Sequence, residues 1–270
     1  MRRVRLVSIA GLVAVLSGVV SHAQQAQPKP FEPTVGQAGK DVVWVPTPPI
    51  LVEKMLDMAK VTPQDIVMDL GSGDGRNVIA AAKRGARAIG VEYNPKMVEL
   101  SRRLAKEAGV SDRATFIEGD MFEADMSKAT VLALFLLPSN LDKLAPKFLT
   151  LKPGTRIVNN TFNATGWEAD SSEQVGGNCT SWCTALLNIV PARVAGTWRL
   201  GSDDLTLTQE VQFITGTLGA TAIAGGKMNG QDITFRAGET EYRGRVNGDQ
   251  MEGTSTTAGK QTKFTATRQK

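Results

Sequence analysis

The chain has 270 residues, 41% hydrophobic and 21% charged, which fits one medium-sized domain followed by a second, smaller one. Its formal net charge is +4, but Arg2, Arg3 and Arg5 account for most of it. Without these three arginines the 31 basic residues become 28, against 27 acidic residues. Without these arginines the charges nearly balance, so the sequence does not indicate a basic patch for nucleic-acid binding.

Residues 1–23 have the pattern of a secretory signal peptide. A basic start precedes the apolar residues 6–20, and Ser21-His22-Ala23 fits a small-x-small cleavage site. The apolar run is shorter than the roughly 20 residues of a membrane-spanning helix, which favours cleavage over an uncleaved anchor. We therefore expect an exported protein, periplasmic or secreted, with membrane anchoring if the leader is retained.

Cleavage would also remove His22, the only histidine of the chain. A mature chain without histidine has no Ser–His or Cys–His catalytic pair and no His-ligated metal site. Its chemistry must work without an imidazole.

Residues 24–40 are rich in Gln, Pro and Gly and are expected to form a flexible linker, with order beginning near Val42. A helix is expected over residues 50–59 after a proline-rich start. Thr47 either caps this helix or also lines a ligand pocket.

An apolar run at residues 66–68 leads into a glycine loop and then a helix expected over residues 77–84. The loop carries one acid and three alternating glycines: Asp69, Gly71, Gly73 and Gly75. Strand, glycine loop and helix start together bring backbone N–H groups to a polar ligand, either a dinucleotide or S-adenosylmethionine. The dinucleotide fingerprint needs Gly or Ala at the sixth position from Gly71, where this chain has Arg76. This mismatch disfavours a dinucleotide and ranks a dehydrogenase last among the functions considered.

Alternating strands and helices continue beyond this loop. Strands are expected over residues 86–91, 114–118, 129–137, 155–162 and 185–190, and helices over residues 95–108 and 141–149. The alternation predicts an α/β doubly wound parallel sheet. Glu92, at the end of the second strand, is placed to accept from both ribose hydroxyls, although a solvated surface role is the alternative. Asp120 follows the third strand and either accepts from the adenine amine or serves only a turn.

A set of short motifs resembles one methyltransferase group. These are V-P-T-P (45–48), D-L-G-S-G-D-G-R (69–76), G-V-E-Y-N-P (90–95), G-D-M-F (119–122), L-L-P (136–138) and P-G-T-R-I-V (153–158). They are similar to the class I S-adenosylmethionine-dependent methyltransferases that modify lysine in the c subunit of ATP synthase, with their bacterial and archaeal relatives. The resemblance covers roughly residues 42–192.

The resemblance implies a class I methyltransferase fold with S-adenosylmethionine as co-substrate and no metal. The residues expected at the donor are Thr47, Asp69, Gly71, Ser72, Gly73, Gly75, Glu92, Asp120 and Met121. Backbone carbonyls at Leu137 and Pro138 either position the acceptor amine or belong to a structural turn. No side chain stands out as a general base, so the catalytic residues are left unassigned.

The predicted function is an exported methyltransferase that acts on a protein lysine, with a protein or a small molecule as the methyl acceptor. In-line methyl transfer needs mainly positioning of donor and acceptor, which suits a chain without imidazole. The alternative is a non-catalytic periplasmic binding protein that retains the fold, because the donor is made in the cytoplasm. A membrane-associated or envelope partner is possible under either function.

The second half contains a loop expected over residues 166–174, in which Trp167 either shapes an acceptor pocket or simply packs. Cys179 and Cys183 are the only cysteines, and export favours a disulfide, although their close spacing does not guarantee one. Residues 41–192 are assigned to the methyltransferase domain. Residues 193–270 form short alternating runs separated by turns such as Asn229-Gly230, which predicts a small antiparallel β-meander.

Overall fold

The structure is a computed structural model that describes residues 31–177 and 179–269. The expected leader over residues 1–23 and residues 24–30 of the expected linker lie outside the described residues. Among the residues described, no helix is long and apolar enough to cross a membrane.

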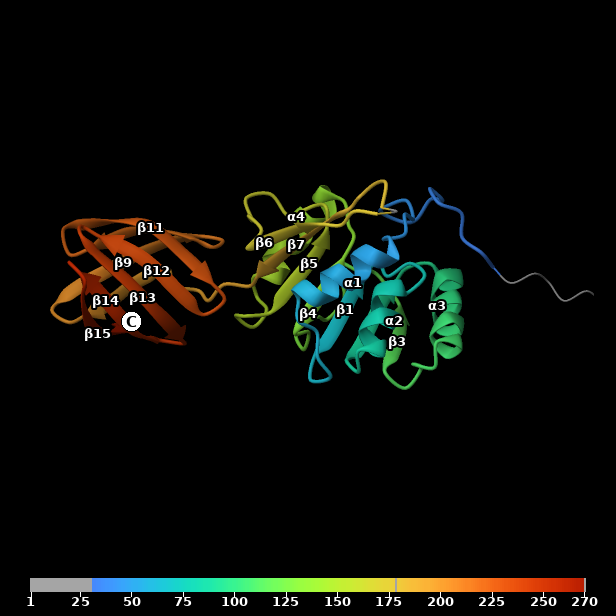
Figure 1. Cartoon of the computed structure of the whole chain (residues 1–270), viewed down its shortest axis with the longest axis horizontal. Coiled ribbons are helices and arrows are strands. Elements are labelled where there is room, and N and C mark those ends of the chain that lie inside the picture. Colours follow the sequence, from blue (N-terminus) through green and yellow to red (C-terminus); the bar gives the residue numbers. More distant parts are fainter. Residues whose placement is uncertain (1–30, 178, 270) are drawn as a thin grey trace, which may run out of the picture. The chain divides into compact units, whose positions relative to one another are not determined.

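A seven-stranded mixed sheet forms the first part of the fold (Figure 1). Its strands are β1 (Ile66–Leu70), β2 (Arg87–Glu92), β3 (Ala114–Glu118), β4 (Val131–Leu134), β5 (Arg156–Asn160), β6 (Ser171–Gln174) and β7 (Thr184–Ile189). The order is β3-β2-β1-β4-β5-β7-β6, with β1 to β5 parallel and β7 antiparallel to both neighbours. The strand order runs one way from β1 to β3 and the other way from β4 to β5, so it reverses between β1 and β4. Ligands of open α/β sheets bind at such a switch point.

Helices cover both faces of the sheet. They are α1 (Pro49–Met58), α2 (Arg76–Lys83), α3 (Pro95–Glu107) and α4 (Pro138–Phe148). Successive strand residues alternate between two apolar cores, so that Val67 packs with α1 to α3 while Met68 packs with α4. The fully buried strand β4 contributes to both cores, as expected for a central parallel strand. The predicted doubly wound α/β class is confirmed.

Helix starts differ from the expected ones in two places. The N-cap of α1 is Pro48, not Thr47, because two prolines begin the helix. Helix α4 begins at Pro138, three residues earlier than predicted, because proline suits a first helical position. Asn94 caps α3 as its sequence indicates, and its Oδ1 accepts from Lys96 N at 3.0 Å.

The segment over residues 166–174 is only partly a loop. Its last residues form β6, which pairs antiparallel with β7 at the sheet edge. All of β6 is solvent-exposed, so it lacks the apolar alternation by which a strand is recognised in sequence.

The C-terminal strands form a closed antiparallel barrel, shown orange to red in Figure 1. They are β8 (Gly196–Leu200), β9 (Asp203–Glu210), β10 (Phe213–Leu218), β11 (Thr221–Asn229), β12 (Asp232–Ala237), β13 (Thr240–Asn247), β14 (Gln250–Thr257) and β15 (Lys260–Arg268). Gly230 and Gly248 take the positive φ of two-residue turns, so the predicted meander is confirmed. The barrel closes through pairing of β8 with β15 and of β9 with β10. Trp198 lies fully buried in its core.

Candidate functional site

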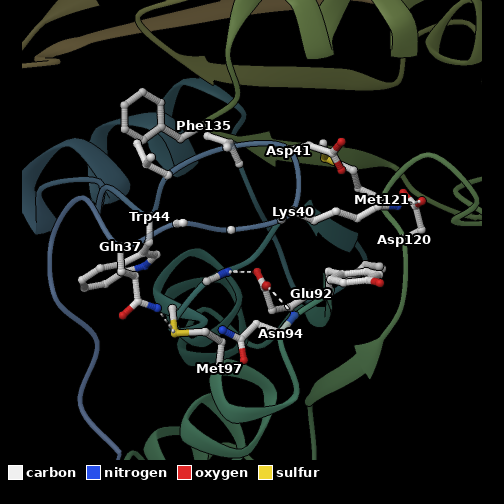
Figure 2. A pocket seen from close by; sticks show the side chains of 18 of the residues that line it. Gln37, Lys40, Asp41, Trp44, Glu92, Asn94, Met97, Asp120, Met121 and Phe135 are labelled. Atoms are coloured by element: carbon white, nitrogen blue, oxygen red, sulfur yellow. Dashed lines mark hydrogen bonds and ion pairs between the residues drawn. The ribbon is translucent and has the colours of Figure 1, made fainter.

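A pocket lies where the parallel strands β1, β2 and β3 end (Figure 2). Five of the residues expected at the donor line it, namely Gly71, Gly73, Glu92, Asp120 and Met121. They come from three separate connections and meet because the carboxyl ends of parallel strands share one edge of a sheet.

Glu92 joins the glycine loop to the start of the next helix. Its Oε2 accepts from Gly73 N and its Oε1 from Asn94 N, each at 2.9 Å (Figure 2). A carboxylate oxygen has two acceptor positions, so each oxygen keeps one for a further donor. Glu92 can therefore hold the loop and still accept from a pair of neighbouring hydroxyls.

The glycines of the loop serve different purposes. Gly71, Gly73 and Gly75 all have positive φ. A Cβ on Gly73 would lie 2.7 Å from Trp44 Nε1, at the pocket wall, whereas one on Gly75 would lie 2.6 Å from Phe116 Cε1 in the core. Gly73 thus opens the pocket, and Gly75 allows α2 to pack closely against the sheet. Gly75 does not line the pocket.

Asp69 and Ser72 are buried behind the pocket and do not line it. Burial raises the pKa of Asp69 well above its ordinary value, against a hydrogen bond that Asn77 Nδ2 donates at 3.1 Å. Within the described residues, Ser72 Oγ has no hydrogen-bond partner. These two side chains support the loop from below.

Thr47 also lies outside the pocket lining. It is buried, its Oγ1 accepts from Asn160 Nδ2 at 3.4 Å, and its carbonyl accepts from Arg76 Nη1 at 2.7 Å. Arg76 also pairs with Asp74, so it ties the glycine loop to the segment before α1. Thr47 thus has a structural position rather than the expected capping one.

Residues 36–44 form a short hairpin over the pocket, which we call the N-terminal hairpin. Trp44 N donates to Gln37 O and Gly36 N to Trp44 O, each at 2.9 Å, and Ala38 bridges to Val43. Order therefore begins earlier than Val42. The hairpin residues Gln37 to Trp44 line the pocket. Their composition resembles that of a linker. Contacts with the pocket wall hold these residues in place, and the composition does not show such contacts.

Lys40 closes the pocket from the hairpin side (Figure 2). Its ammonium pairs with Asp120 Oδ2 and lies 4.8 Å from the centre of the Tyr93 ring. This ammonium, with the N–H of Phe122, holds the pKa of Asp120 below its ordinary value. The pocket beneath the hairpin is partly open to solvent, and the cavity within it measures about 90 Å³.

The residues expected near the acceptor lie beyond the pocket. Leu137 is 43% exposed and Pro138 begins α4, so both face solvent at the end of β4. Trp167 is buried in the core under α4, so it packs and does not shape an acceptor pocket.

The pocket also contains residues that the sequence did not single out. These are Trp44, Tyr93, Met97 and Phe135. Tyr93 follows Glu92 directly and Phe135 follows β4. For these two residues the sequence signal was an aromatic side chain at the end of a parallel strand.

The residues present suit S-adenosylmethionine. Glu92 and Asp120 supply carboxylate acceptors, Gly71 and Gly73 have no side chain to block the approach of a ligand to the loop, and Met121 and Val91 supply apolar surface. Among the described residues, no group of three or more His, Cys, Asp or Glu side chains is placed to hold a metal ion.

Comparison with known proteins gives a consistent result. A family model described as the ANTKMT methyltransferase domain matches residues 69–171. A protein-lysine N-methyltransferase of Saccharolobus islandicus is 45% identical over 129 residues, which are 47% of this chain and 80% of that protein. The adenine nucleotide translocase lysine N-methyltransferase of Mus musculus is 37% identical over 43% of this chain.

The match spans only about half of two animal relatives, 52% of this mouse enzyme and 56% of the Xenopus laevis lysine N-methyltransferase of the ATP synthase c subunit. Among solved structures, an RNA methyltransferase of Salinibacter ruber in complex with S-adenosyl-L-homocysteine is 44% identical. It covers 56% of this chain and 96% of its own, with a TM-score of 0.52. The residues matched by the family model, 69–171, run from the end of β1 to the start of β6.

Proposed function

This chain belongs to the class I S-adenosylmethionine-dependent methyltransferase family that includes the archaeal protein-lysine N-methyltransferase, and we propose that it methylates the side-chain amine of a protein lysine. The observation that carries the proposal is the placement of Glu92. It anchors the glycine loop and keeps acceptor positions free at the pocket, as a ribose requires. The S-adenosyl-L-homocysteine in the Salinibacter ruber structure supports the same donor.

The proposed chemistry is an in-line displacement. The lone pair of a neutral amine forms a bond to the methyl carbon, the carbon–sulfur bond breaks with its electron pair going to sulfur, and the new ammonium loses a proton to solvent. Holding donor and amine in near-contact can supply about 7–11 kcal/mol of the barrier. Glu92, the glycine loop and Asp120 position the methyl donor. An apolar acceptor site lowers the pKa of lysine and so favours the neutral amine.

The relatives support a protein acceptor. The archaeal relative is named a protein-lysine methyltransferase, and the animal relatives are named for two membrane proteins, the c subunit of ATP synthase and the adenine nucleotide translocase. We accordingly propose a membrane-associated protein as the partner. RNA is the second candidate acceptor, because the Salinibacter ruber structure carries that name. The near-balance of acidic and basic residues favours protein.

We also propose that the enzyme acts outside the cytoplasm. The leader-like residues 1–23 support export, and so does the disulfide between Cys179 and Cys183, because disulfides persist mainly in oxidising compartments. Export of folded protein with the donor already bound is one route by which the donor reaches the site.

Two measurements test the proposal. Calorimetry with S-adenosylmethionine should give binding heat with the wild type and much weaker binding with Glu92→Ala. Transfer of isotope-labelled methyl into envelope proteins, located by mass spectrometry, should mark lysine; label in RNA would select the second candidate. Absence of binding heat would contradict the methyltransferase assignment. Binding without transfer to either acceptor would instead support the non-catalytic alternative.

A further inference from the structure

Three aromatic rings gather beside the donor pocket. Phe135 follows β4, Phe162 follows β5, and Trp182 lies in the connection between β6 and β7. Their ring centres are 6.4 Å apart for Phe135 and Phe162, 6.2 Å for Phe135 and Trp182, and 5.2 Å for Phe162 and Trp182. We call these residues the aromatic trio. Phe135 also lines the donor pocket, so the trio adjoins the place of methyl transfer.

The backbone has an unusual conformation at or next to two of these rings. Trp182 itself has a φ of 59°, a value that is uncommon for a residue with a side chain. Thr161, just before Phe162, has a φ of 63°, and Phe162 N donates to Asn160 O at 2.7 Å across it. This i to i+2 bond at positive φ is the pattern of the rare, strained γ-turn. Such strain persists only where the surroundings fix it, and it concentrates at functional sites.

The disulfide fixes the position of Trp182. Cys179 and Cys183 close a short loop that contains the tryptophan, and both cysteines pack against the core under α1 to α3. Val175 N donates to Cys183 O at 2.9 Å, which secures the end of the loop. Trp182 nonetheless remains 43% exposed, an unusual position for a large side chain that is so firmly anchored.

The ring arrangement suits a compact cation better than a flat base. The Phe135 and Phe162 rings are nearly parallel, with 15° between their planes, and the Trp182 ring is tilted by 53–54° to both. The ring faces of the trio therefore point in more than one direction. Ammonium groups are attracted to the faces of aromatic rings, whereas a nucleobase stacks on one face and brings a phosphate that needs cations nearby.

We infer that the aromatic trio is the acceptor site and takes a lysine side chain, with Trp182 held in place by the Cys179–Cys183 disulfide. The inference rests on the proposed function. The rings cover the methylene stem of the incoming lysine and remove water from its amine. As positive charge moves from sulfur to nitrogen during transfer, the ring faces stabilise the charge that develops on nitrogen, an interaction that strengthens in the transition state.

The test compares three variants with the wild type: Trp182→Ala, Trp182→Phe and Phe213→Ala. Phe213 is an exposed aromatic residue of the barrel and serves as the matched control. The acceptor is a Gly/Ser peptide with one central lysine, and its norleucine analogue has the same stem without the amine. For Trp182→Ala we expect kcat/KM to fall by about 10-fold, with an unchanged Kd for the donor. Trp182→Phe should restore most of the loss, and Phe213→Ala should behave as wild type.

Direct binding supplies a readout independent of turnover. With protein saturated with S-adenosylhomocysteine, the lysine peptide should bind more tightly than the norleucine peptide, and Trp182→Ala should remove that preference. Reduction of the wild type with a phosphine, which converts the disulfide to two thiols, should lower kcat/KM in the same way, and reoxidation should restore it.

The outcomes separate the two proposals. Unchanged kcat/KM in Trp182→Ala, or a weakened donor Kd of similar size, would overturn the assignment of the trio to the acceptor. Failure of the proposed function looks different, because the wild type would then bind the donor and leave the lysine peptide unlabelled. Loss of donor binding on reduction would show that the disulfide supports the whole fold, contrary to its proposed role of holding Trp182 alone.

Discussion

Glu92→Ala is the substitution with the largest effect expected at the donor site. The carboxylate accepts from Gly73 N and Asn94 N at 2.9 Å, and one acceptor position per oxygen is left for the two ribose hydroxyls. A hydrogen bond to a charged group contributes about 1.5–3 kcal/mol. Two such bonds, taken at the lower end of the range, amount to about 3 kcal/mol, on the order of a 100-fold rise in Kd.

The assay is calorimetric titration with S-adenosylmethionine and with S-adenosylhomocysteine. The matched control is Glu118→Ala, because Glu118 ends β3 in register with Glu92 but is exposed outside the pocket lining. Its Kd should equal that of the wild type. Glu92→Gln should lie in between, since one amide oxygen still accepts while the amide nitrogen faces a backbone N–H. A Kd for Glu92→Ala within a factor of about three of wild type would refute the ribose role.

Further predictions concern the loop, its buried acid and the hairpin. Gly75→Ala should lose more unfolding free energy in urea than Gly109→Ala. Both glycines have positive φ, costing about 1–2 kcal/mol, but only at Gly75 does the added methyl meet an aromatic carbon at 2.6 Å. Asp69→Asn should gain thermal stability relative to wild type as pH rises. Burial raises the pKa of Asp69, so its contribution to stability is present below its unfolded pKa of about 3.9 and is lost as pH rises through the folded value; parallel melting curves would contradict this. Lys40→Met and Asp120→Ala both break the ion pair over the pocket. Titration should show weaker donor binding only for Asp120→Ala, because that variant also removes the acceptor for the adenine amine; equal effects would show that Asp120 only holds Lys40.

Much of the sheet could be predicted because its strands are short, apolar and separated by clear helix signals. The strand over residues 114–118 has the predicted bounds. The strand expected over residues 129–137 is shorter, because the apolar run continues after the chain has left the ladder. Phe135 there faces the pocket and Leu136 the core, so hydrophobicity alone does not mark the strand end.

Less of the site could be predicted, because part of it depends on contacts between residues far apart in sequence. Glu92 ends β2 and Asp120 follows β3, so topology brings them together, and their positions were predictable. The N-terminal hairpin and Trp182 owe their positions to contacts made far away in sequence. Lys40 meets Asp120 across 80 residues, and Trp182 meets Phe135. Neither local composition nor periodicity carries that information.

Strand order divides the proposed reaction between two halves of one sheet. The donor half, β3-β2-β1, supplies Asp120, Glu92 and the glycine loop, whereas the neighbouring half, β4-β5-β7, carries Phe135, Phe162 and the loop of Trp182. The two halves meet between β1 and β4, where the strand order of the sheet reverses. Under the proposed function the methyl group crosses this boundary. A change of acceptor in evolution would then require substitutions only after β4, β5 and β6, while the donor site after β1, β2 and β3 is kept.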